Sequence, residues 1–302
     1  MKRLKEYLEK QSGYLMLLPA LLCIGFVHLY PSIDAIRMSF FDIQLLKQGR
    51  PFVYFQNFSN ALKDPIFLQA FFNTIAWTVL SLVFATVFAL YVSVKLNKSF
   101  KGRSFFRAIF LAPWITPPFI VAQIWKTIFN ETFSPINSLL LSTHLTEAPI
   151  SFLNSTKLFL GFFSTPLLWI IVVNVWTIFP FMMVMFLAGL QTMSKDVYEA
   201  GRIDGASNIQ QFFRITLPQL LPVISSTLLI VGIWQFNNFN ISYLLTHGGP
   251  LHQTELLAVK VYNEVFYNFK YSYGAAISVL MFLVILIPAV IYIRRETKAN
   301  DA

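Results

Sequence analysis

Four side-chain amides stand within six residues of a long apolar stretch, in the segment WQFNNFN at residues 234–240. An amide is costly in apolar surroundings unless it finds a hydrogen-bond partner. The partner is either a neighbouring helix, which the amide then ties in place, or the hydroxyl group of a bound molecule. Trp234 and Asn238 are four residues apart and share one helix face, so they are our candidates for lining a cavity.

A second polar stripe lies in the apolar segment NVWTIFPF at residues 174–181. Asn174, Thr177 and Phe181 stand at positions i, i+3 and i+7, which places them on one face of a helix. An amide, a hydroxyl and an aromatic ring suit a neutral polyol. A sugar stacks its apolar C–H face on the ring, while amides bind its hydroxyls. The stripe therefore indicates a binding face for an uncharged, hydroxyl-rich molecule.

Three prolines fall within six residues in the segment APWITPP at residues 112–118. Each proline lacks a backbone donor and crowds the carbonyl four residues earlier, so a helix through this segment has to bend or break. Carbonyls freed at membrane depth are tolerated only against protein or a water-filled cavity. A packing kink is the alternative interpretation, but Trp114 beside the prolines favours a cavity wall.

The composition is that of an integral membrane protein. Hydrophobic residues make up 56% of the 302 residues and charged residues 12%, against about 25% charged in soluble domains. The one cysteine, Cys23, excludes intrachain disulfides and a thiolate metal cluster, and the four histidines lack metal-ligand spacing, so we expect no metal site. The formal net charge is +9, but the basic residues stand between apolar runs, which indicates membrane topology rather than nucleic-acid binding.

The apolar runs predict an all-α membrane protein with six transmembrane helices, each close to the roughly 20 residues that a bilayer requires. The expected spans are about 13–38 with an interruption at Pro31, 71–95, 105–129, 160–190, 219–245 and 272–293. The connections between them are too short for a separate domain. We therefore expect one transmembrane domain over 13–294, flanked by short segments at 1–12 and 295–302.

Lysine and arginine are distributed unevenly among the connections. If the N-terminus is cytoplasmic, fifteen of the 23 Lys and Arg fall on the cytoplasmic side and eight on the other. Because positive residues accumulate in cytoplasmic loops, we expect both termini, segments 1–12 and 295–302, to lie in the cytoplasm. The connection 191–218 between the fourth and fifth spans then faces the cytoplasm as well.

This connection, 191–218, is longer and more highly charged than a simple turn between two spans would be. We expect it to form two short helices joined at Gly205, whose backbone geometry should be one that a Cβ disfavours. Tyr198, Ile203 and Phe212 are apolar residues in this charged segment, and at a membrane surface they would be exposed. The segment therefore predicts a docking site for another protein, with those three residues at its centre.

Two sets of residues compete to cap the first of these helices. Asp196 with Glu199 three residues later has the spacing of a capping box, and Ser194 is an alternative cap. We expect the second helix to open at Ala206 and Ser207 and to end before Pro218.

The chain has no ATP-binding phosphate loop of the pattern Gly-x-x-x-x-Gly-Lys-Ser/Thr, and no glycine in it is followed by lysine. Energy from ATP would have to come from a partner, which would also hold the ATP and Mg²⁺, so we expect no cofactor in this chain. Nor does the sequence carry the nucleophile and base of an enzyme. Carboxylates also avoid the middle of the expected spans, which argues against a stand-alone ion-coupled carrier.

The segment EAGRIDGA at residues 199–206, closed by ITLP at 215–218, resembles the cytoplasmic coupling loop of ABC importer permeases. That loop reads Glu-Ala-Ala, then Gly, then Ile-x-Leu-Pro, and this chain has Gly201 where the family usually has Ala. In a helix this exchange costs about 1 kcal/mol. The segment LLTHGGP at 244–250 resembles the Leu-Leu-Thr-x-Gly-Gly-Pro turn after the fifth span of the maltose-type sugar permease subunit. The resemblance covers about residues 12–294.

The resemblance implies a type I ABC importer permease fold with a helix-turn-helix coupling loop at 191–218. The positions implied to bind substrate are Trp114, Asn174, Thr177, Ile178, Phe181, Trp234, Gln235 and Asn238. The residues expected to couple to the ATPase are Tyr198, Glu199, Ala200, Asp204, Gly205, Ala206, Phe212, Ile215, Leu217 and Pro218. Pro118 and Ile178 differ from the residues that the maltose version has at those positions.

The resemblance also implies partners: a second homologous permease subunit, two copies of a cytoplasmic ABC ATPase that bind ATP and Mg²⁺, and an extracytoplasmic solute-binding protein. The location would be the inner or plasma membrane of a bacterium or archaeon, and a sugar or oligosaccharide would cross it by alternating access.

An importer of another solute, such as glycerol phosphate or a peptide, is the alternative within transport. An anionic substrate would require Arg or Lys in the cavity, and the segments 112–118, 174–181 and 234–240 contain none. A stand-alone secondary transporter is a further alternative, but it would not explain the connection 191–218.

Overall fold

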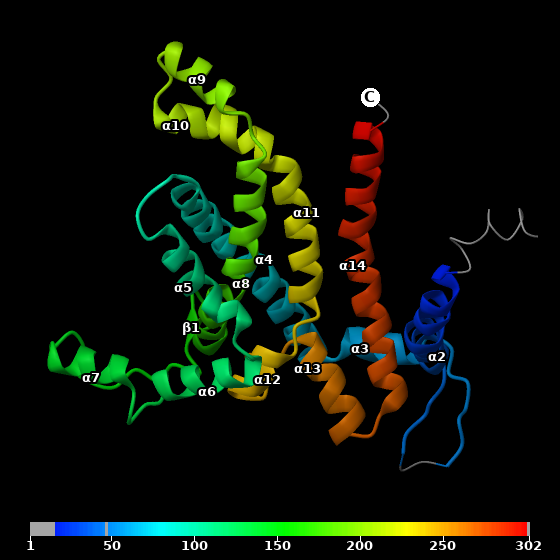
Figure 1. Ribbon diagram of the computed structural model, residues 1–302. Helices are drawn as coiled ribbons and strands as arrows, with labels where there is room; N and C mark the ends of the chain where they lie inside the picture. Colours follow the sequence, from blue (N-terminus) through cyan, green and yellow to red (C-terminus); the bar gives the residue numbers. More distant parts are fainter. Residues whose placement is uncertain (1–15, 46–47, 301–302) are drawn as a thin grey trace, which may run out of the picture. The chain divides into compact units, whose positions relative to one another are not determined.

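Apolar helices account for most of the structure, a computed structural model that describes residues 16–45 and 48–300, without the side chains of 296 and 298–300. Within these residues, five helices are long and apolar enough to cross a membrane: Met16–Met38, Pro65–Asn97, Thr165–Gln191, Asn208–Thr246 and Tyr271–Arg295. A pair of shorter helices, Arg103–Ile115 and Pro118–Ile128, passes the same test together and is bent by 96° (Figure 1). The all-helical membrane fold expected from six apolar runs is confirmed.

The chain divides into two compact units, residues 1–64 with 261–284 and residues 65–260 with 285–302. The described elements of the first unit are the π-helical turn η1 (Gly25–Leu29), α2 (Tyr30–Met38), α3 (Gln56–Lys63), the π turn η3 (Asn263–Tyr267) and the first part of α14 (Tyr271–Asn300). No residue in the most apolar window of the helix Met16–Met38 is buried within the chain. In a membrane, the surface of this helix therefore contacts lipid or another chain.

The interruption expected at Pro31 is a widening of the helix rather than a break. The Tyr30 N–H donates to the Gly25 carbonyl, five residues back, and Pro31 follows in the first turn of α2. A wider turn suits this position, because proline offers no donor and its ring crowds the carbonyl of the preceding turn.

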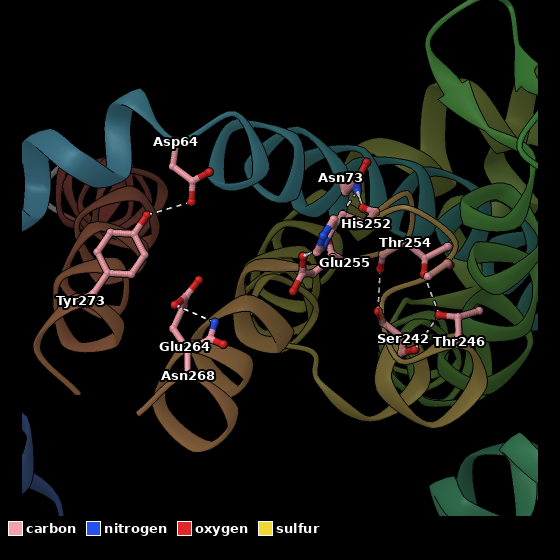
Figure 2. Close-up of polar contacts among 11 residues, drawn as sticks. Asp64, Asn73, Ser242, Thr246, His252, Thr254, Glu255, Glu264, Asn268 and Tyr273 are labelled. Atoms are coloured by element: carbon pink, nitrogen blue, oxygen red, sulfur yellow. Dashed lines mark hydrogen bonds and ion pairs between the residues drawn. The ribbon is translucent and has the colours of Figure 1, made fainter. Parts of the chain in front are cut away.

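Side-chain hydrogen bonds join the elements of the first unit. Tyr273 of α14 donates to Asp64 Oδ2 at 2.9 Å (Figure 2). The Asn57 amide of α3 donates to the carbonyls of Ser39 and Phe41, at 2.9 and 2.8 Å. Through these bonds α3 and the residue that follows it are tied both to the segment after α2 and to α14.

The second unit contains most of the helices. They are α4 (Pro65–Asn97), α5 (Arg103–Ile115), α6 (Pro118–Ile128), α7 (Pro135–Ser142), α8 (Thr165–Gln191), α9 (Lys195–Ile203), α10 (Asn208–Gln211), the π turn η2 (Phe212–Thr216), α11 (Leu217–Phe236), α12 (Asn240–Thr246) and most of α13 (Leu257–Tyr262). A short hairpin, β1 (Leu158–Phe159) antiparallel to β2 (Phe163–Ser164), precedes α8. In Figure 1, α9 and α10 lie at one end of α8 and α11, and α6 and α12 lie toward the other.

Helix α4 packs against α8 along a stripe of small residues. Ser81, Ala85, Ala89 and Ser93 recur every four residues, and none of them is exposed. Small side chains let two helices approach closely, and close approach is how transmembrane helices gain van der Waals contact. Phe186 of α8 is fully buried in the same cluster as the two alanines.

Helix α8 also approaches α11 closely, at Gly189. A Cβ at this position would lie 2.7 Å from Leu220 Cδ1 and 3.0 Å from Val223 Cγ2, which is tighter than ordinary van der Waals contact between carbon atoms. The absence of a side chain at Gly189 therefore lets the end of α8 pack directly on the start of α11.

The proline-rich segment breaks the third expected span, 105–129, as the sequence predicted. Helix α5 ends at Ile115, and Thr116 is extended, with φ −70° and ψ 128°, because a residue before proline is disfavoured in helical geometry. Pro117 is the N-cap of α6 and Pro118 opens its first turn, where the missing donor is not needed.

The fifth expected span, 219–245, lies within the membrane-long segment Asn208–Thr246, but the helix is interrupted inside it. Helix α11 ends at Phe236, and α12 begins only at Asn240. The amides compete with the backbone for hydrogen bonds. Asn237 Nδ2 donates to the Ile233 carbonyl at 2.9 Å, and Asn238 Oδ1 accepts from the backbone N–H of the second residue of α12 at 3.4 Å. The amide run therefore interrupts the helix.

Candidate functional site

Three aromatic side chains from three different helices come together in the second unit. The ring centroids of Trp114 (α5) and Phe181 (α8) are 5.5 Å apart, and those of Phe181 and Trp234 (α11) are 5.0 Å apart. These separations are typical of interacting aromatic pairs. Trp114 and Trp234 are 47% and 50% exposed, so the rings form an accessible wall rather than part of the buried core.

Two of the expected substrate residues, Asn174 and Gln235, are buried between helices. The Asn174 amide Nδ2 donates to Ser81 Oγ of α4 and to Gln235 Oε1 of α11, both at 2.8 Å. Asn174 is 1% exposed and Gln235 is 3% exposed. These amides therefore bridge three helices, which is the interhelical alternative considered for the amide run. Asn174 Oδ1 is also buried, and it has no hydrogen-bond partner among the described residues.

The remaining expected substrate residues are partly buried. Thr177 donates its hydroxyl to the Val173 carbonyl of its own helix at 2.9 Å. Asn238 lies at the break after α11, with its Nδ2 3.5 Å from Gln235 Oε1. Ile178 packs against the apolar cluster between α4, α8 and α11. Of the eight residues, the three aromatic ones form the wall, and Asn174 and Gln235 join α4, α8 and α11 through hydrogen bonds.

The connection between α8 and α11 forms two helices, α9 and α10, joined through Gly205. Gly205 has φ +76°, with nothing within 4 Å of where a Cβ would stand, so the expectation of a geometry that favours glycine is confirmed. Ser207 caps α10, and Gln210 completes a capping box with it. The capping box expected from Asp196 is wrong, because Ser194 caps α9 by accepting from the Asp196 N–H at 3.2 Å.

Helix α10 ends at Gln211, before Pro218 as expected, but the helical backbone continues beyond it. After α10 the chain passes through the π turn η2, in which the Leu217 N–H donates to the Phe212 carbonyl, and continues directly into α11. Pro218 then stands in the first turn of α11. A proline in a first turn lacks only a donor that no carbonyl there requires, so Pro218 does not stop the helix.

Several of the expected coupling residues hold α9 against the second arm of this segment, which consists of α10 and η2. The Tyr198 hydroxyl lies 3.1 Å from Thr216 Oγ1 and 3.2 Å from Met193 Sδ. A Cβ at Gly201 would lie 2.9 Å from Ile215 Cδ1. The glycine that replaces the usual alanine therefore stands where α9 packs on the second arm, which the sequence alone did not indicate.

The exposed apolar residues of the segment differ from those expected. Ile203 is 87% exposed, as predicted, whereas Tyr198 and Phe212 are partly buried. Ile209 and Phe213 are 72% and 60% exposed. They are apolar residues of the same charged segment, but they were not among the three that we expected at the centre of the docking site. Of the other expected coupling residues, Glu199, Ala200, Asp204, Gly205 and Pro218 are exposed, and Ala206, Ile215 and Leu217 are partly buried.

The loop after the segment LLTHGGP carries polar residues that sequence reasoning missed. His252 Nδ1 lies 2.5 Å from Glu255 Oε2, and the Asn73 amide of α4 donates to the backbone carbonyls of both residues at 3.2 Å (Figure 2). Thr254 Oγ1 lies 2.6 Å from Thr246 Oγ1 of α12. These bonds fasten the loop to α4 and α12, and no local pattern in the sequence indicates that Asn73 reaches it.

Comparison with known proteins places this arrangement in a family. Residues 81–295 match the family described as "Binding-protein-dependent transport system inner membrane component". The trehalose/maltose transport system permease protein of Thermococcus litoralis is 33% identical over 291 residues, covering 96% of this chain and 95% of that protein.

Two solved structures share the fold. A bacterial ABC transporter involved in the import of the acidic polysaccharide alginate has a chain that matches with a TM-score of 0.79 at 24% identity, covering 97% of this chain and 99% of that one. The bacterial alginate transporter in complex with alginate pentasaccharide-bound periplasmic protein matches with a TM-score of 0.78 at 23% identity, covering 96% and 95%. The chain therefore belongs to the family of binding-protein-dependent transport system inner membrane components, as a multi-pass permease subunit of an ABC importer.

Proposed function

We propose that this importer carries a sugar or oligosaccharide and that the wall formed by Trp114, Phe181 and Trp234 binds it. The observation that carries the proposal is the convergence of three partly accessible aromatic rings from three helices. Two of those helices end in a break beside their ring. An aromatic wall with a few placed polar groups is the usual form of a site for a neutral ligand.

The polar residues around the wall fit hydroxyl groups. Thr177 and Asn238 are partly accessible, and the buried Asn174 Oδ1 is an acceptor without a partner among the described residues. A buried acceptor left unpaired costs about 1–3 kcal/mol, so a ligand hydroxyl or a water that reaches it would be favoured. We assign substrate contact to Thr177, Ile178 and Asn238 with the three rings, and support of the wall to Asn174 and Gln235.

The substrate class follows from charge as well. The segments 112–118, 174–181 and 234–240 contain no Arg or Lys, and an anionic substrate such as glycerol phosphate would need a cation there. The Thermococcus litoralis relative is named for trehalose and maltose, which are neutral sugars. Both arguments favour a neutral carbohydrate.

In the proposed mechanism, transport proceeds by alternating access in an assembly of this chain, a second homologous permease subunit, two ABC ATPase subunits and an extracytoplasmic solute-binding protein. The ATPases hold ATP and Mg²⁺, and the segment α9–α10 docks on one of them through Ile203 and its exposed neighbours. Both termini and this segment lie in the cytoplasm, and the membrane is the inner or plasma membrane of a bacterium or archaeon.

The test is to purify the assembled transporter, reconstitute it with candidate solute-binding proteins and measure ATP hydrolysis with different solutes. We expect neutral sugars or oligosaccharides to stimulate hydrolysis in the presence of the matching binding protein. Stimulation by glycerol phosphate or a peptide, with none by any sugar, would overturn the proposed substrate class.

A further inference from the structure

Two arginines of α5 converge on one uncharged side chain. Arg103 and Arg107 are one helical turn apart, and with its oxygen facing them the Gln191 amide at the end of α8 accepts from Arg107 Nη2 at 3.0 Å and from Arg103 Nη2 at 3.2 Å. The Nε atoms of both arginines are buried and have no hydrogen-bond partner among the described residues. Each guanidinium offers five N–H donors, so most of their capacity is unused.

No carboxylate of the described residues neutralises this pair. Neither arginine takes part in an ion pair within residues 16–45 and 48–300, and the sequence from 65 to 130 contains no Asp or Glu. Lys95, Lys98 and Lys101 precede the arginines and add to the positive charge. The two like charges held against a neutral amide repel each other. An anion between them would offset the unfavourable energy of that repulsion.

The surface next to the arginines is apolar. Phe105, Phe106 and Ile109 of α5 are 66%, 45% and 49% exposed. A cationic pair beside exposed aromatic and aliphatic side chains, at the beginning of a membrane helix, matches a molecule with an anionic head and apolar tails. Basic pockets between membrane helices on the cytoplasmic side bind anionic lipid head groups in this way.

We propose that Arg103 and Arg107 form a binding site for the phosphate head group of an anionic phospholipid, whose acyl chains lie along the exposed face of α5. Guanidinium groups bind phosphate through pairs of parallel N–H···O bonds, and the Nη N–H groups that do not face Gln191 would supply them. The site is independent of the proposed sugar site, because it involves neither the aromatic wall nor the segment α9–α10.

The experiment measures phospholipid binding to the assembled transporter by native mass spectrometry, with phosphatidylglycerol and phosphatidylcholine added in turn. We expect the double variant Arg103→Gln/Arg107→Gln to bind phosphatidylglycerol about tenfold more weakly, because hydrogen bonds to a charged group are lost. The matched control is Arg294→Gln/Arg295→Gln, which removes the same charge from two exposed arginines near the end of α14. Its phosphatidylglycerol binding should equal that of the unmodified protein.

Three results would overturn the proposal. The first is equal phosphatidylglycerol binding by both double variants, and the second is equal binding of phosphatidylcholine and phosphatidylglycerol by the unmodified protein. The third is full displacement of the lipid by inorganic phosphate at the same concentration, which would identify a site for free anions. If the Arg103→Gln/Arg107→Gln protein does not assemble, Arg107→Gln alone is measured in the same way, with a loss of several-fold expected.

Discussion

Asn174 Nδ2 lies 2.8 Å from Gln235 Oε1, and this hydrogen bond joins the middle of α8 to the last turn of α11. Replacing Asn174 with Ala removes the donor and leaves the buried Gln235 oxygen with only the 3.5 Å approach of Asn238. We expect the transporter to lose about 1–3 kcal/mol of stability, measured as a lower unfolding temperature of the purified complex. Asn237→Ala, which removes an exposed amide bonded only within its own helix, is the control. An unchanged unfolding temperature for Asn174→Ala would contradict the supporting role.

Trp234 is expected to act on transport rather than on stability. The ring is half exposed and contacts Phe181, so Trp234→Ala removes stacking surface for a sugar while leaving the bridging amides in place. We expect sugar uptake per assembled complex to fall about tenfold, with basal ATP hydrolysis unchanged. Phe84→Ala is the control, since Phe84 is a 56% exposed aromatic residue of α4 outside the wall. Unchanged sugar uptake by the Trp234→Ala variant would show that this ring does not contribute to sugar binding.

Gly205→Val is expected to uncouple transport from ATP hydrolysis. A β-branched side chain is strongly disfavoured at φ +76°, so the turn between α9 and α10 should be distorted while membrane insertion is unaffected. Gly161→Val is a matched control, because Gly161 has φ +79° and equally open surroundings but lies in the hairpin between β1 and β2. Both uptake and hydrolysis are measured on reconstituted complexes. Coupled transport by the Gly205 variant would contradict the role of this turn.

Ile203→Ser is expected to weaken the association with the ATPase. An 87% exposed isoleucine loses its contact with water only when a partner covers it, and burial of such a side chain contributes about 1.5–3 kcal/mol. We therefore expect the ATPase to dissociate during purification in detergent, which size-exclusion chromatography detects. Leu145→Ser, at a 72% exposed leucine after α7, should retain the ATPase. Loss of the ATPase in both variants would point to a general defect instead.

The segment after α6 should respond to pH through Glu131. Its carboxylate accepts hydrogen bonds from Ser151 at 2.5 Å and Asn154 at 3.2 Å, and these bonds hold the pKa of Glu131 below its usual range. The unfolded carboxyl titrates near pH 4.3, about the value of a model peptide. The stabilisation is therefore present above that pH and is lost as the pH falls through the lower pKa of the folded state.

Hydrogen exchange of residues 130–154 tests this dependence when the protein is compared with Glu131→Gln at each pH. We expect the unmodified segment to be better protected at neutral pH and the difference to disappear in acid. A difference that stays constant across the titration would show that the charge of Glu131 does not matter.

Local rules predicted those features that depend on neighbouring residues. The break at Pro117 and the positive φ of Gly205 follow from the backbone preferences of proline and glycine, and the structure has both. The caps were less certain, because Ser194 and Asp196 are two residues apart and both can accept from the first turn. The break after Phe236 was missed, since an amide in an apolar run can bind either a neighbouring helix or its own backbone.

Long-range partners were beyond the reach of the sequence. Helical spacing placed Asn174 and Phe181 on one face, but it could not say that Asn174 would be buried against α4 while Phe181 met two tryptophans. The sequence could not predict the approach of Arg103 and Arg107 to Gln191 either, because the arginines and the glutamine belong to different helices with no shared local pattern.

The π turn at Phe212–Thr216 joins α10 to α11 without an unstructured linker, because the backbone stays hydrogen-bonded through it. A displacement of α10 should therefore also move α11, whereas an unstructured linker would allow α10 to move alone. Trp234 lies in the last turn of α11, so we expect a movement of the proposed docking segment to reach one ring of the aromatic wall.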